Sequence, residues 1–299
     1  MSDSADPLVH ALAGAAGGAL ALSVTYPLST ITMKLQNNED GKERDELTAK
    51  RVILDILSKD GVLGLYSGLE SALYGMTVTN FIYYYFYEKT GKYFKMLNKV
   101  SQLSTTNTMM TGAIAGVITA VATNPVWVAN TRITLKKSDV STLRTIKNIV
   151  AKEGAQNLFN GLKPALILVI NPIIQYTIFE QLKIIVLNSQ VGKKRNLSAN
   201  WAFILGAIGK IAATSITYPY ITLKTRMHMS TSSSAKGESS SSLVLEILKK
   251  EGIAGLFNGF FYKLSQSVLT VALLFYFKEG LLSSTLKLLK IIRSRRIKT

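Results

Sequence analysis

The chain has 299 residues, no Cys, only two His and a formal net charge of +17. The missing Cys excludes disulfide scaffolds, thiol catalysis and Cys-ligated zinc. The two His argue against a His-built metal site or a Ser-His-Asp triad, so we expect no metal and no cofactor. A hydrophobic content of 47% excludes a wholly disordered chain. The basic charge alone would suggest nucleic acid, but the charges avoid long stretches of the sequence.

Six stretches of the chain carry few or no charged residues. Residues 7–33 and 100–131 contain no Lys, Arg, Asp or Glu, and each exceeds the roughly 20 apolar residues that cross a bilayer. Four shorter or interrupted stretches lie at 71–87, 164–179, 196–223 and 264–277. A buried core helix is the alternative for any one of them, but together they predict an integral membrane protein.

A threefold internal repeat organises these stretches. Pro27, Pro125 and Pro219 stand 98 and 94 residues apart, and a base follows each proline by seven residues: Lys34, Arg132 and Arg226. An acid-Gly-x4-aromatic-x-Gly motif then recurs with identical spacing at Asp60 to Gly68, Glu153 to Gly161 and Glu251 to Gly259. The repeat divides one transmembrane domain into three units, residues 1–99, 100–196 and 197–299.

Each unit predicts the same three elements. A first membrane helix carries small residues spaced for close packing in lipid, with the proline near its end. Apolar residues at i, i+3 and i+4 indicate a short amphipathic surface helix, which the acid-Gly pair ends. A second membrane helix runs to an acid: Glu88, Glu180 or Glu279. We predict an all-α membrane protein with six transmembrane helices, in three tandem two-helix repeats with pseudo-threefold symmetry, and a short surface helix in each repeat.

This pattern resembles the mitochondrial carrier family over nearly the whole chain. The resemblance implies six helices around a central water-filled cavity that opens alternately to the cytosol and to the organelle interior. It places the proline ends toward the interior and both termini in the cytosol, and it implies exchange of small anionic solutes, not enzyme activity. Residues 124–132, 171–176 and 263–270 look most like peroxisomal adenine nucleotide carriers. Mitochondrial NAD and FAD carriers share Trp127 and a Lys in the fifth helix, so they are near competitors.

The resemblance also implies two gates. The family closes the interior side with acids two residues after each proline and bases five after; here these positions are Ser29 and Thr32, Trp127 and Asn130, Ile221 and Lys224. No acid remains, so we expect a weak interior gate that lowers the barrier to interconversion. The expected interior-gate residues are Pro27, Lys34, Gln36, Pro125, Arg132, Pro219, Lys224 and Arg226. The expected cytosolic-gate residues are Glu88, Glu180, Lys183 and Glu279, with Glu88 to Lys183 as the one family-type pair left.

Lys210 is the clearest candidate for a substrate contact. A charge inside a membrane helix is costly and usually faces a cavity, although a long side chain can also reach the interface. The family's contact points imply an apolar slot for a flat ring such as adenine, with lysines holding the phosphates; Gln266 replaces the usual arginine. The Asn and Gln side chains fit helix-to-helix hydrogen bonds equally well. Lys263 is close to a helix start, so a position at the membrane interface also explains it. The predicted substrate-binding residues are Gly75, Met76, Asn80, Ile167, Leu168, Asn171, Gln175, Lys210, Lys263 and Gln266.

These features together predict an antiporter of the peroxisomal membrane that exchanges ATP for AMP or ADP. The rival is a carrier of coenzyme A, FAD or NAD in the peroxisome or the mitochondrial inner membrane, and a rival of another class is a non-transporting membrane scaffold. Basic residues 287–298 suit anionic lipid better than nucleic acid. The cluster 193–195 is similar to basic loops that accompany peroxisomal targeting, so the peroxisomal import machinery is a possible partner.

Overall fold

The computed structural model describes residues 7–37, 46–136, 140–189, 199–229 and 240–296, and within these ranges the chain is helical and contains no strand. The first repeat holds α1 (Pro7–Gln36), α2 (Glu46–Asp60), η1 (Val62–Tyr66) and α3 (Leu69–Leu97). The second holds α4 (Thr105–Lys136), α5 (Thr142–Glu153), η2 (Ala155–Phe159), α6 (Leu162–Ile167), η3 (Leu168–Ile170) and α7 (Asn171–Ser189). The third holds α8 (Ala199–Met229), α9 (Ser240–Lys250), α10 (Gly252–Gly255) and α11 (Phe260–Arg296).

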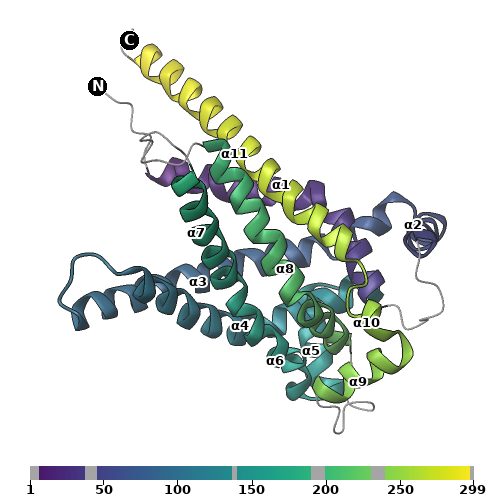
Figure 1. Ribbon diagram of the computed structural model, residues 1–299. Helices are drawn as coiled ribbons and strands as arrows, with labels where there is room; N and C mark the ends of the chain where they lie inside the picture. The colour runs from purple at the N-terminus through teal and green to yellow at the C-terminus, as the bar shows by residue number, and fades with distance from the viewer. Residues whose placement is uncertain (1–6, 38–45, 137–139, 190–198, 230–239, 297–299) are drawn as a thin grey trace.

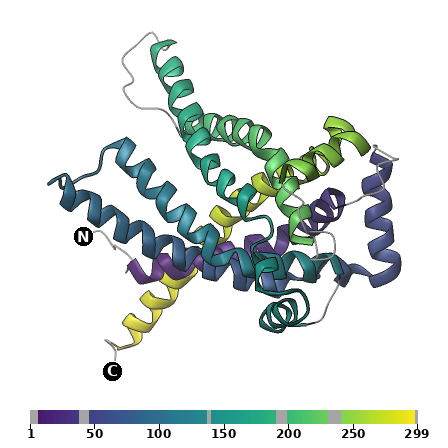
Figure 2. The same cartoon turned by 90° about the horizontal axis from the view of Figure 1, so that it is seen from below.

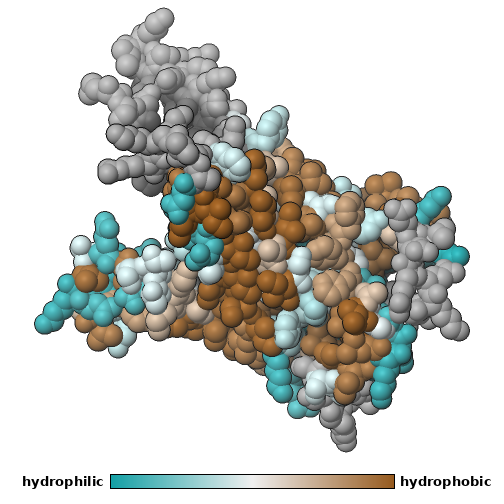
Figure 3. Space-filling model, in the orientation of Figure 1, coloured by the Kyte–Doolittle hydropathy of each residue, from teal (hydrophilic) through white to brown (hydrophobic). Residues whose placement is uncertain are grey.

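Long apolar helices dominate this architecture. Four segments of the described chain are long and apolar enough to cross a membrane: Thr105–Lys136, Ala155–Asn188, Trp201–Met229 and Gly252–Lys278. The other two long helices, α1 and α3, have 30 and 29 residues and pack along α11 and α4. A band of hydrophobic surface runs across the middle of the molecule between more polar ends (Figure 3). The predicted all-α membrane fold is confirmed.

The helices form three tight pairs, and each pair joins two different repeats. The extensive contacts are those of α1 with α11, α3 with α4, and α7 with α8. The surface helices lie at one end of the molecule, and both termini lie toward the other, where the three pairs diverge (Figures 1 and 2). We call the first the proline end and the second the terminal end. At the proline end α1, α4 and α8 contact one another.

The three surface helices end where the acid-Gly motif predicts. Gly61, Gly154 and Gly252 adopt positive φ angles of 64°, 93° and 66°, which a residue with a side chain rarely adopts. At α5, the Gly154 amide donates to the carbonyl of Ile149, which closes the last turn. Ile149 is 3% exposed, so the amphipathic face of α5 is buried against the bundle.

The sequence predicts that the second membrane helix of each repeat runs to its acid, and the structure adds a break in one of these helices and a later end for two of them. In the second repeat this helix is broken, because a 3₁₀ turn at Leu168–Ile170 separates α6 from α7. Pro172 explains the break: it has no N–H to donate to Leu168, and its ring crowds that carbonyl. The helices α3 and α7 also continue nine residues beyond Glu88 and Glu180.

Candidate functional site

The proline end is closed by buried polar side chains. Among the most buried residues of α1, α4 and α8 are Gln36, Asn130, Thr134 and His228, each at most 2% exposed. Buried polar groups need hydrogen-bond partners, because leaving one unsatisfied costs about 1–3 kcal/mol. Their partners therefore define how the three helices are held together.

Gln36 braces α1 against α8. Its amide Nε2 donates to the hydroxyl of Tyr218 over 3.0 Å, and its Oε1 accepts from the hydroxyl of Thr225 over 2.9 Å. The Tyr218 hydroxyl in turn donates to the backbone carbonyl of Asn258 at 2.8 Å, in the loop before α11. Both ends of the Gln36 side chain are thus engaged, as expected for a residue that matches the family's bracing glutamine.

Two further hydrogen bonds complete a ring that joins α1, α4 and α8. The Tyr26 hydroxyl of α1 lies 3.2 Å from the Thr134 hydroxyl of α4. The Thr131 hydroxyl of α4 lies 3.0 Å from Nδ1 of His228 in α8. Thr134 and His228 occupy the position nine residues after their prolines, as Gln36 does. Hydrogen bonds from the residue nine positions after each proline therefore join all three helices.

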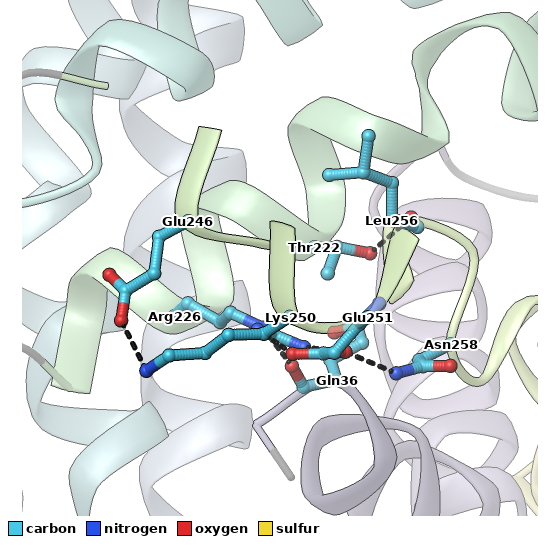
Figure 4. Close-up of polar contacts among 8 residues, drawn as sticks. All are labelled: Gln36, Thr222, Arg226, Glu246, Lys250, Glu251, Leu256 and Asn258. Carbon is cyan, nitrogen blue, oxygen red and sulfur yellow. Dashed lines mark hydrogen bonds and ion pairs between the residues drawn. The ribbon is translucent and has the colours of Figure 1, made fainter. Parts of the chain in front are cut away.

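Two of the bases seven residues after the prolines act as clamps between repeats. Arg132 pairs with Glu153 at 2.6 Å, and its Nε donates to the carbonyl of His228 at 3.0 Å. Arg226 makes two contacts to Glu251, at 2.5 and 2.8 Å, and its Nε donates to the Gln36 carbonyl at 2.7 Å (Figure 4). Each arginine thus joins the acid at the end of its own repeat's surface helix to the last turn of the next repeat's first helix.

The spacing from the prolines predicts the two arginines as gate residues but does not predict these partners. The signal was present, because Glu153 and Glu251 are the acids of the acid-Gly motif and recur in phase with the bases. Lys34 and Asp60 are the equivalent residues of the first repeat. Tyr26 and Tyr218 were also missed, although each directly precedes a repeat proline.

Three lysines gather beyond this closure. Lys210 and Lys224 come from α8 and Lys263 from the first turn of α11, and all three are half-buried. The charge of Lys263 lies within electrostatic range of both Lys210 and Lys224. Lys263 donates to Oε1 of Gln266 at 3.0 Å, but none of the three pairs with a carboxylate in the part of the chain that the structure describes. We call these residues the lysine cluster.

A pocket of about 210 Å³ lies where α3, α4, η3 and α8 meet, and Lys224 is part of its wall. Trp127 and Leu168 supply large apolar surfaces, and the indole Nε1 donates to the Thr79 hydroxyl at 3.1 Å. Gly75 lies behind the indole, since a Cβ there would be 3.6 Å from Trp127 Cζ2. Two of the predicted slot residues, Gly75 and Leu168, are thus next to this pocket.

Met76 and Ile167, the other two slot residues, are not among the residues that line this pocket, and Ile167 is 43% exposed. The 3₁₀ turn that begins at Leu168 changes the helical register there. Gly75, Met76, Ile167 and Leu168 therefore do not all line this one pocket, and the slot formed by the four residues stays a prediction.

The predicted amide contacts divide between two roles. Asn171 donates to the Thr217 hydroxyl at 2.6 Å and to a carbonyl of α8, which is the helix-to-helix alternative. The backbone of α7 at Gln175 approaches α8 closely as well, because a Cβ at Gly209 would lie 2.9 Å from the Gln175 carbonyl oxygen. Gln266 is 7% exposed and faces the lysine cluster, whereas Asn80 is exposed.

The predicted cytosolic gate is not assembled in this conformation. Lys183 lies 3.2 Å from Glu180 of its own helix, and Glu88, its expected partner, is exposed on α3. Glu88 and Lys183 stand on α3 and α7, which belong to helix pairs that diverge at the terminal end (Figures 1 and 2). The side chain of Glu279, the cluster 193–195 and the side chains of residues 287–298 lie outside the described residues.

Known proteins share the threefold repeat of this chain. Residues 3–98, 101–190 and 196–287 match the family described as mitochondrial carrier protein. The peroxisomal membrane protein PMP47B of Candida boidinii is 39% identical over 93% of this chain and 86% of its own. The peroxisomal adenine nucleotide carrier 1 of Glycine max is 31% identical over 95% of this chain and 93% of its own. The peroxisomal nicotinamide adenine dinucleotide carrier of Arabidopsis thaliana is 28% identical over 95% and 98%.

Members of this family are transporters, not enzymes, and the first of these relatives is a peroxisomal membrane protein. Three matched segments cover almost the whole chain, in phase with its threefold repeat. The chain is therefore a multi-pass transporter of the peroxisomal membrane, and it belongs to the mitochondrial carrier family.

Proposed function

We propose that this carrier exchanges adenine nucleotides across the peroxisomal membrane, ATP against AMP or ADP, by alternating access. The lysine cluster carries the proposal. The half-buried ammonium group of Lys263 repels those of Lys210 and Lys224, and no carboxylate of the described chain pairs with any of the three. A polyphosphate supplies the missing negative charge and accepts several charge-assisted hydrogen bonds.

The closed proline end supports the exchange mode. In this conformation hydrogen bonds and arginine clamps hold α1, α4 and α8 together, while the helix pairs diverge at the terminal end. A substrate thus approaches from the terminal side and meets the lysine cluster above the closure. Transport then requires the closure to open and the terminal end to assemble the gate of Glu88, Glu180, Lys183 and Glu279.

Three rival substrates, one rival role and two proposed partners belong with this function. Coenzyme A, FAD and NAD share an adenylate with ATP, and one relative is a carrier of nicotinamide adenine dinucleotide. A non-transporting scaffold does not require a cluster of unneutralised charge, so the lysines count against it. We also propose that the C-terminal basic residues bind anionic lipid. Residues 193–195 are proposed to bind the peroxisomal import machinery.

The test is uptake of labelled ATP by purified protein in liposomes preloaded with AMP, ADP, coenzyme A, NAD, FAD or buffer. We expect uptake to need internal AMP or ADP and to fall in Lys210→Ala. The matched control is Lys59→Ala, which removes an exposed lysine that pairs with Asp55 on α2, and it should exchange normally. Uptake that depends only on coenzyme A, NAD or FAD would transfer the protein to the rival class, and no exchange with any of them would exclude nucleotide transport.

A further inference from the structure

We propose that the pocket beside Trp127 is a base-binding subsite, in which the flat ring of the transported nucleotide stacks on the indole while Lys224 binds the adjoining phosphate. This inference rests on the proposed function and adds how the ligand is recognised. The pocket offers a cavity of sufficient size, an aromatic ring held in place, and a lysine that pairs with no carboxylate among the described residues.

The cavity has room for a heteroaromatic ring. Its volume is about 210 Å³. An engineered protein cavity of about 150 Å³ already binds benzene. Leu168 and Val169 of η3 line it together with Trp127 of α4. An aromatic ring flanked by aliphatic side chains suits a planar ligand, because every base offers a π-face for stacking.

The indole is held in position before any ligand arrives. Its Nε1 donates to Thr79 at 3.1 Å, and the absence of a side chain at Gly75 lets α3 approach the ring. Fixing an aromatic side chain in advance lowers the entropy lost on binding. Since its N–H is already bonded within the protein, the ring face is the part of Trp127 left to contact a ligand.

Charge identifies the rest of the ligand. Trp127 stands two residues after Pro125, and Lys224 stands five after Pro219. These are an acid and a base position of the family's gate, but here an aromatic ring replaces the acid. Lys224 is left without a carboxylate among the described residues and lies within electrostatic range of Lys263. A ligand that spans the pocket therefore joins an aromatic base to an anion, as a nucleotide does.

The chain permits a direct optical test, because Trp127 and Trp201 are its two tryptophans. Trp201 is 42% exposed near the start of α8, so Trp201→Phe leaves a folded protein with Trp127 as the single reporter. We expect AMP, ADP and ATP to quench its fluorescence. Tripolyphosphate should compete for labelled ATP through the lysines without quenching. The reciprocal variant Trp127→Phe, which reports from Trp201, should show no quenching.

Exchange measurements give the second arm. Trp127→Leu removes the stacking face while keeping an apolar side chain, and it should raise the ATP concentration needed for half-maximal exchange by about tenfold. Thr79→Val, which frees the indole N–H, should weaken it less and reduce the quenching. Normal ATP exchange by the Trp201→Phe protein without any quenching overturns the base subsite and leaves nucleotide transport intact. Equal quenching by tripolyphosphate also overturns it, and absence of all nucleotide binding overturns both proposals.

Discussion

The buried clamp between Arg226 and Glu251 gives the sharpest prediction for stability. Their side chains are 9% and 4% exposed, and Glu251 also accepts from Asn258 at 3.0 Å (Figure 4). Replacing Arg226 by Gln removes the charge partner of a carboxylate that water hardly reaches. It also removes the donor to the Gln36 carbonyl, so α8 loses its link to α1 at that point.

The expected loss follows from burial. Removing one partner of a buried ion pair costs about 3–5 kcal/mol, because the remaining charge stays desolvated. One kcal/mol lowers the midpoint of thermal unfolding by about 2–4 °C in a chain of 150–250 residues. We therefore expect Arg226→Gln to lower the unfolding midpoint in detergent by roughly 6–20 °C.

A surface pair on the neighbouring helix supplies the control. Lys250 and Glu246 lie 2.6 Å apart, but their side chains are 62% and 42% exposed (Figure 4). Such pairs contribute about 0–1 kcal/mol, so Lys250→Gln should lower the midpoint by less than about 4 °C. The double variant Arg226→Met with Glu251→Met leaves no buried charge and should recover most of the loss. Equal shifts for Arg226→Gln and Lys250→Gln would refute the reasoning that burial sets the magnitude.

Three further predictions concern the closed proline end. Ser29→Asp combined with Asn130→Lys restores an ion pair of the family's network and should slow exchange in liposomes; unchanged or faster exchange would contradict the weak-gate hypothesis. Gln36→Leu leaves its two former partners without that bond, costing about 1–3 kcal/mol in the closed state, and should speed exchange; a slower initial rate would count against it. Gly161→Ala must adopt a φ of +74° and place its Cβ 2.7 Å from the His228 ring, so its unfolding midpoint should fall. Gly206→Ala, with nothing within 4 Å, should keep or raise the midpoint.

The sequence predicts the helices well because the repeat supplies three independent copies of each signal. Charge-free stretches, repeat prolines and acid-Gly pairs agreed in phase, and the family match confirms the fold. The exception is the helix around Leu168, because a charge-free stretch does not reveal the effect of Pro172. A missing backbone donor does not alter hydrophobic spacing, so the 3₁₀ turn had to be found in the structure.

The site was less predictable because its partners are distant in sequence. Gln36 and Tyr218 are 182 residues apart, and Thr131 and His228 are 97 apart. No local pattern pairs such residues. The bases and acids of the clamps lie only 21 and 25 residues apart and repeat in phase, so comparing the repeats position by position would have found them. For Asn171, comparing the repeats would not have helped. The residue type alone does not distinguish a ligand contact from a helix-to-helix hydrogen bond.

Loss of the gate acids has two physical consequences that belong together. Without acids after the prolines, closure of the proline end depends on neutral hydrogen bonds and on arginines whose charge is balanced by Glu153 and Glu251. Lys224 has no such balance in the described chain, so its charge adds to that of Lys210 and Lys263 above the closure. At an effective dielectric constant of about 20, like charges in such a setting repel by about 1–4 kcal/mol depending on distance. A bound polyphosphate removes this repulsion, so under the proposed function the substrate itself lowers the cost of bringing these helices together.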